Sequence, residues 1–165
     1  MSEKNWKEWA YILIIFGCIQ YVILTTLAMI FYAGGTAVNK NAPGYSFWAN
    51  FFSDLGMVKA WSGRDNTISY IIYTVSLTIV GVVVIPFNLA FKHVFNESSK
   101  EKKLSKGGSL FGILFGIFVI PIAFAPHDIY PMEHFIFVLI AFTALLISII
   151  IYAVVIHSSK SYPHI

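Results

Sequence analysis

Four side chains that can bind a metal ion or transfer a proton lie within eight residues of one short segment. They are His127, Asp128, Glu133 and His134. Imidazole and carboxylate together suit zinc or another divalent ion, and the same groups serve as general acids and bases. The spacing matches no established metal motif. A second interpretation therefore stays open, in which the carboxylates cap the following helix and His134 donates a hydrogen bond to one of them.

A second polar group lies earlier, in the segment 34–66. Its centre is Ser53-Asp54, and Asn50 lies about one helical turn before Asp54. Apolar residues recur between 45 and 61 at three- and four-residue steps, namely Trp48, Phe51, Phe52, Leu55 and Val58. This period predicts a helix that lies in the membrane interface. Asp54 is then either a reactive carboxylate at the membrane surface or part of a cap or hydrogen-bond hub.

The composition is that of an integral membrane protein. Of 165 residues, 58% are hydrophobic and 12% are charged, and the mean hydropathy is +0.74. A water-soluble enzyme of this size could not bury so much apolar surface, and a disordered chain would need the opposite balance. The net charge of +3 is too small and too scattered to indicate nucleic acid. The sole cysteine, Cys18, excludes a disulfide within the chain and a cysteine-cluster metal site.

Four uncharged runs are long enough to cross a bilayer as helices, which takes about 20 residues. They cover residues 10–33, 67–91, 107–126 and 135–156. Backbone groups inside lipid must be paired within the segment, so these runs must be helical. We therefore expect an all-α integral membrane fold that forms a single transmembrane domain. It is a four-helix transmembrane bundle with an interfacial helix in the loop after the first span.

The distribution of lysine and arginine sets the expected orientation. Eight of the eleven lie before the first run, between the second and third runs, or after the fourth. Both termini are then cytoplasmic, in a multi-pass protein of the cell membrane. The segments 34–66 and 127–134 would share the outer face.

This shared face leads to a geometric expectation. An unpaired carboxylate at the membrane surface is costly, so each should find a partner nearby. We expect Ser53 or Asp54 to lie within hydrogen-bond or shared-ligand reach of His127, Asp128 or His134.

Three glycines at four-residue steps in the third run predict close helix packing. They are Gly108, Gly112 and Gly116, and residues this small let helix backbones approach closely in lipid. We expect them to pack inside the bundle, with an interface between two copies of the chain as the alternative.

Two stretches of the chain carry motifs typical of a known family. The first reads Pro-Gly-Tyr-Ser at 43–46 and Asn-Phe-Phe-Ser-Asp-Leu-Gly at 50–56, and the second runs from Pro-His-Asp at 126–128 to His134. They resemble prokaryotic membrane proteins known as domain of unknown function 998, and the resemblance covers most of the chain. That family is distantly similar to the Frag1/DRAM/Sfk1 group, some members of which are linked to lipid-anchor remodelling.

The chain departs from the family pattern in two respects. Ala125 stands where the family usually has phenylalanine. Family members are also expected to continue with further spans. If such spans complete a site, this chain would complete it by oligomerising or would lack it. The family name itself implies no activity.

Two functions from different classes fit these observations. The first is a structural or interaction subunit, in which the polar cluster holds the outer loop on the bundle. Its partners would be membrane lipids, a second copy of the chain or other membrane subunits. The alternative is an enzyme that acts on a lipid or lipid-linked substrate in the outer leaflet. Its catalytic residues would be Ser53, Asp54 and His134, and a divalent metal such as zinc would be bound by His127, Asp128, His134 and Asp54.

A b-type cytochrome is a further alternative, which the histidine spacing disfavours. Paired histidines in a four-helix bundle can bind haem. His134 and His157 are 23 residues apart on one expected helix, or roughly 35 Å. That distance exceeds what two stacked haems in one bilayer need.

Reporter fusions test the expected orientation. A fusion at the C-terminus should be active only as a cytoplasmic reporter, and a fusion near Asn41 only as an external one, because lysine-rich segments resist translocation. External activity at the C-terminus would reject the orientation and the outer placement of both polar segments.

Overall fold

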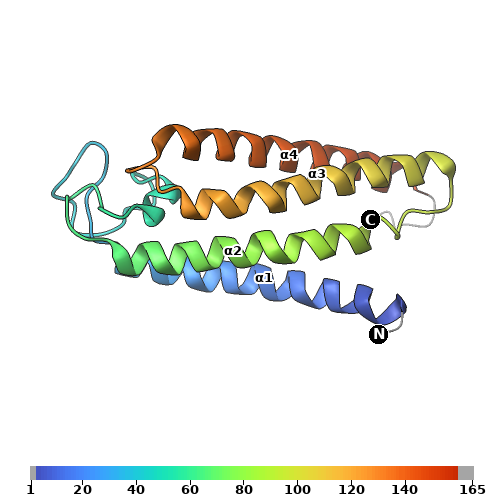
Figure 1. The fold of residues 1–165 in the computed structure, drawn as a ribbon, viewed down its shortest axis with the longest axis horizontal. Coiled ribbons are helices and arrows are strands. Elements are labelled where there is room, and N and C mark those ends of the chain that lie inside the picture. The colour runs from blue at the N-terminus through green and yellow to red at the C-terminus, as the bar shows by residue number, and fades with distance from the viewer. Residues whose placement is uncertain (1–2, 160–165) are drawn as a thin grey trace.

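Four long helices make up most of the computed structural model, which describes residues 3–159. They are α1 (Glu3–Phe31), α2 (Thr67–Phe91), α3 (Ser99–Phe124) and α4 (Pro131–Ser158) (Figure 1). All four are long and apolar enough to cross a membrane. Within the described range there is no strand, only an isolated bridge between Lys59 and Asp65. The expected all-α fold with four candidate membrane spans is confirmed.

The caps explain why two helices begin before their uncharged runs. α3 begins at Ser99 because the Ser98 hydroxyl accepts a hydrogen bond from the Glu101 N–H at 3.1 Å. α4 begins at Pro131, where the missing N–H of proline costs no helical hydrogen bond. Part of the segment between the second and third uncharged runs is therefore helical.

The loop between α1 and α2 contains a shorter helix than the apolar period indicates. It is η1 (Phe52–Gly56), a 3-10 helix of five residues, and the rest of 45–61 forms turns and irregular structure. η1 packs against α2 and α1, and three of its residues are buried: Asp54, Leu55 and Gly56. The helix expected in this loop thus lies on the bundle instead of presenting a long apolar face to lipid.

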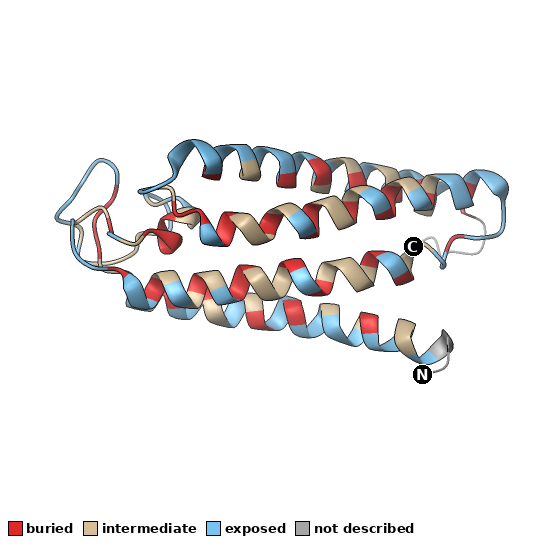
Figure 2. Cartoon of the chain, in the orientation of Figure 1, coloured by how far each residue is buried: buried red, intermediate tan, exposed pale blue. Residues whose placement is uncertain are grey.

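Each long helix packs on the next one in the chain. α1 contacts α2, α2 contacts α3, and α3 contacts α4, whereas α1 and α4 do not form a packed interface. Buried residues face neighbouring helices and exposed residues cover the outside (Figure 2). Many of the exposed side chains are large and apolar, as expected for surfaces that contact lipid.

The two ends of the bundle differ in structure. At one end, which we call the loop end, the segment 32–66 lies beside the turn 125–130 (Figure 1). The opposite end holds the start of α1, the link 92–98 and the end of α4 (Figure 1). The candidate functional residues are all at the loop end.

The α3 glycines lie at helix contacts inside the bundle, as expected. A Cβ on Gly112 would overlap the Asn88 side-chain amide of α2, and a Cβ on Gly116 would lie 2.8 Å from the Gly81 carbonyl oxygen. Gly108 faces an aromatic ring of α4. The three glycines therefore set the distance of α3 from both of its neighbours within one chain.

Gly116→Ala should destabilise the bundle, because its new Cβ would meet backbone of α2. Gly107→Ala is the matched control, since it lies on the same helix and its Cβ would meet only Ile151, at 3.8 Å. Both changes gain the same helix propensity. We expect Gly116→Ala to lower the free energy of unfolding by about 1–3 kcal/mol relative to the control, measured by thermal unfolding in detergent. Equal melting of the two variants would show that Gly116 does not limit the approach of α2 and α3.

Candidate functional site

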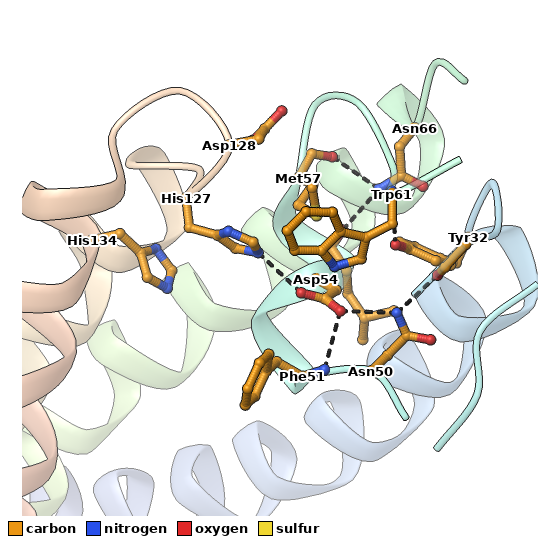
Figure 3. A network of polar contacts seen from close by, with 12 residues as sticks. Tyr32, Asn50, Phe51, Asp54, Met57, Trp61, Asn66, His127, Asp128 and His134 are labelled. Atoms are coloured by element: carbon orange, nitrogen blue, oxygen red, sulfur yellow. Dashed lines mark hydrogen bonds and ion pairs between the residues drawn. The ribbon is translucent and has the colours of Figure 1, made fainter. Parts of the chain in front are cut away.

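A buried carboxylate joins the two polar segments of the loop end. Asp54 comes from η1 and is 0% exposed, and its Oδ1 lies 3.0 Å from Nε2 of His127, on the turn between α3 and α4. Figure 3 shows the His127 imidazole turned towards this carboxylate. The expected approach of these two segments is confirmed by this contact.

The other carboxylate oxygen of Asp54 is held by its own loop. It accepts hydrogen bonds from Asn50 Nδ2 at 2.8 Å and from the Phe51 N–H at 3.1 Å. Asn50 also donates to the Gly35 carbonyl oxygen at 3.0 Å and accepts the Ser46 N–H at 2.9 Å. Asp54 is therefore a hub that ties η1 to the preceding loop, in agreement with the structural interpretation of this residue.

The pKa of Asp54 reflects a balance between burial and hydrogen bonding. Burial raises the pKa, but hydrogen bonds from His127 and Asn50, with a contribution from Trp61, hold it below the ordinary value of 3.8. The buried Trp61 Nε1–H is directed towards the carboxylate but makes no hydrogen bond of standard geometry (Figure 3). The carboxylate is therefore charged at neutral pH.

His134 is the second imidazole at the loop end, in the first turn of α4. Its Nδ1 lies 2.7 Å from the Ala125 carbonyl oxygen, which can only accept, so Nδ1 carries the hydrogen. In the neutral ring Nε2 is then an acceptor. The partner of His134 is thus a backbone carbonyl and not the carboxylate expected in the structural interpretation. The ring packs edge to face on His127, with centroids 5.6 Å apart.

Asp128 links the α3–α4 turn to the loop between α1 and α2. Its carboxylate accepts the Val58 N–H at 3.1 Å and the Lys59 N–H at 2.9 Å. The side chain is exposed and lies apart from the Asp54–His127 pair (Figure 3). Asp128 therefore does not cap α4, as the structural interpretation had it, but links two segments that are distant in sequence.

The Asn66 side chain also joins separate segments of the loop end, and no sequence pattern identified it. It is 2% exposed; its Oδ1 accepts the Ala33 N–H at 3.0 Å and its Nδ2 donates to the Met57 carbonyl oxygen at 2.8 Å. It thereby joins the end of α1, the residue after η1 and the start of α2 (Figure 3). The sequence feature that could have indicated this role is the position of Asn66 immediately before the second apolar run.

The expected metal ligands do not converge on one point. Between residues 3 and 159, no group of three or more His, Cys, Asp or Glu side chains is placed to hold a metal ion. Asp128 is engaged by backbone N–H groups instead. The metal-binding roles of Asp54, His127, Asp128 and His134 stay predictions that this geometry does not favour.

A cavity adjoins the two histidines. It has a volume of about 620 Å³ and lies between the four long helices and η1. Its wall is mainly apolar and includes Tyr21, Tyr73, Leu77, Val119, Phe135, Val138 and Phe142. Ser53, His127 and His134 contribute the polar part of the lining. The Ser53 hydroxyl has no hydrogen-bond partner among residues 3–159, so it is available to a ligand.

The haem alternative finds no support in the histidine positions. His134 and His157 lie in the first and last turns of α4. The two imidazoles are therefore at opposite ends of the bundle.

Comparison with known proteins points to one family. The profile of the family described as "Protein of unknown function (DUF998)" matches residues 26–162. No curated protein and no solved structure matches the chain. The roles of the site residues therefore depend on geometry alone.

Asp54→Asn should destabilise the loop end by about 1–3 kcal/mol, because an amide nitrogen would face hydrogen-bond donors. The control is Glu8→Gln, the same carboxylate-to-amide change at an exposed side chain without a hydrogen-bond partner among residues 3–159, and it should change stability by less than about 0.5 kcal/mol. The folded-state pKa of Asp54 lies below its ordinary value, so its stabilisation is present above pH 3.8 and is lost as the pH falls through the folded-state value. The stability difference between wild type and Asp54→Asn should thus shrink as the pH falls below 3.8. A difference that instead grows below pH 3.8 would contradict the assigned charge state.

Proposed function

The chain belongs to the DUF998 family, and from its geometry we propose that it binds a membrane amphiphile at the loop end. The polar head would lie against His127 and His134, and the hydrocarbon would occupy the adjoining cavity. The observation that carries this proposal is the cavity of about 620 Å³, apolar along its walls and polar at one end.

The size and lining of the cavity support a small-molecule ligand. Ligand sites typically enclose about 300–1,000 Å³ and are mostly apolar, with a few polar groups that fix orientation. The polar groups available here are the His134 Nε2 acceptor, the His127 ring and the Ser53 hydroxyl. They suit a head that both donates and accepts hydrogen bonds, such as a hydroxyl.

The position of the cavity favours a ligand that arrives from lipid. Its wall includes residues well inside the candidate spans, such as Leu77 and Phe142. α1 and α4 do not form a packed interface, so the cavity can be reached sideways from the hydrocarbon region. With the expected positive-inside orientation, the head would be at the level of the outer leaflet.

The hydrogen bonds of the loop end give the cavity a fixed boundary. Asp54 and Asp128 each bind a second segment of the loop end, which holds η1 and the α3–α4 turn in place beside the cavity. This is the structural role expected of the polar cluster. In the proposal it serves ligand binding, because a preorganised site loses less entropy on binding than a mobile one.

A second candidate function is hydrolysis of a bound lipid ester. It is favoured by the His134 tautomer, whose Nε2 can accept a proton from water in the cavity that Ser53 also lines. Release of fatty acid from a reconstituted ester lipid by wild type but not by His134→Gln would support it. Absence of turnover with retained binding would leave the protein as a binding subunit.

Filling the cavity tests the binding proposal. Val138→Trp places an indole in the cavity wall, and Leu139→Trp makes the same change at the next residue, which is 56% exposed and outside the lining. Native mass spectrometry of the protein released from membranes should find a bound amphiphile on wild type and on Leu139→Trp. Occupancy should fall about tenfold on Val138→Trp, because overlap with the ligand costs at least 1.4 kcal/mol. A wild-type protein without bound amphiphile would overturn the proposal.

A further inference from the structure

We infer that the amphiphile has a single hydrocarbon chain longer than one membrane leaflet, lying in a groove between α1 and α4 that runs the depth of the bundle. Long-chain isoprenoid alcohols are a chemical class of this shape. The inference rests on the proposed function and adds the length and class of the ligand.

Three cavities join to form the groove. The cavity beside the histidines adjoins a second one of about 270 Å³, with which it shares Tyr21, Leu77, Val119 and Phe142. The second adjoins a third of about 370 Å³ and shares Ile14, Val84, Phe115 and Leu145 with it. Each shared set comes from all four long helices, so the cavities succeed one another along the bundle axis.

The groove is longer than the chain of a lipid in one leaflet. His134 lines its loop end and Ile156 its far end, and these residues are 22 positions apart on α4. At 1.5 Å per residue the groove is about 33 Å long. The hydrocarbon core of a bilayer is about 30 Å thick, so one leaflet contributes about 15 Å. A chain that ends at mid-membrane would leave the third cavity empty.

The cavities suit a hydrocarbon chain. Their volumes are about 620, 270 and 370 Å³, and the lining of each comes from all four long helices. A chain in the groove would therefore contact all four helices.

The two ends of the groove show where the polar head belongs. The loop end has two imidazoles and a free hydroxyl in its lining. The lining of the far cavity contains no charged or histidine side chain. Its Ser148 hydroxyl donates to Gly108 at 2.8 Å, and its Asn88 amide donates to Val84 at 3.0 Å. One lipid with its head at the loop end fits this asymmetry better than two lipids from opposite leaflets.

A tryptophan substitution that obstructs the groove tests the length of the bound chain. Leu145 lines the second and third cavities, whereas Leu146 is 58% exposed and lines neither. The probes are two linear isoprenoid alcohols in nanodiscs, with extended chains of about 15 and 30 Å. Wild type and Leu146→Trp should bind the long probe about tenfold more tightly than the short one, and Leu145→Trp should bind both equally. Equal binding of both probes by wild type would overturn the inference and leave the proposed function intact.

A cysteine reporter locates the chain end without disturbing packing. Cys18 is replaced by alanine, and a single cysteine is introduced by Ala153→Cys in the far cavity or by Val154→Cys outside it. The long probe should protect Ala153→Cys from a lipid-soluble maleimide, and the short probe should not. Neither probe should protect Val154→Cys. Protection of Ala153→Cys by the short probe would show that a second lipid enters from the opposite leaflet, against a single long chain.

Discussion

The pairing of the buried Asp54 carboxylate organises the loop end. A charge removed from water is costly unless hydrogen bonds replace its hydration, and Asp54 obtains them from three sources. Its own loop supplies Asn50 and the Phe51 N–H, and the α3–α4 turn supplies His127. Because one carboxylate needs all of these partners, η1 and the turn cannot move apart without leaving it unpaired. Asp128 adds a second link of the same kind at the surface.

The order of helix packing explains why a groove exists. Glycines at the α2–α3 contact bring these helices close together, so they form the centre of the bundle with α1 and α4 at its sides. The space between the two outer helices then has apolar walls and no helix to fill it. An empty apolar space of this size is unfavourable in a protein interior, because its lining loses packing contacts. In a membrane, hydrocarbon chains are available to fill it.

The loop end separates polar groups that hold the fold together from polar groups that are free for the proposed ligand. The carboxylates of Asp54 and Asp128 are bound by protein donors, so their role is to join segments of the loop end. His134 donates a hydrogen bond from Nδ1 to the Ala125 carbonyl oxygen, which leaves Nε2 free to accept one. The Ser53 hydroxyl is also free to bind a ligand. The structural hypothesis and the ligand-binding hypothesis therefore assign roles to different residues, and both can be true of one protein.

The sequence by itself determined the four spans, the packing role of the glycines and the meeting of two polar segments. These features depend on local properties: the length of apolar runs, the size of one side chain, and the cost of an unpaired charge. The apolar period of 45–61 could not show that only η1 is helical, since the same period suits a helix on lipid and a loop packed on the bundle. Only the tertiary structure decided the partners of His134 and Asp128 and the groove between α1 and α4. Those partners are backbone groups and helices distant in sequence, and no local pattern encodes which of them will meet.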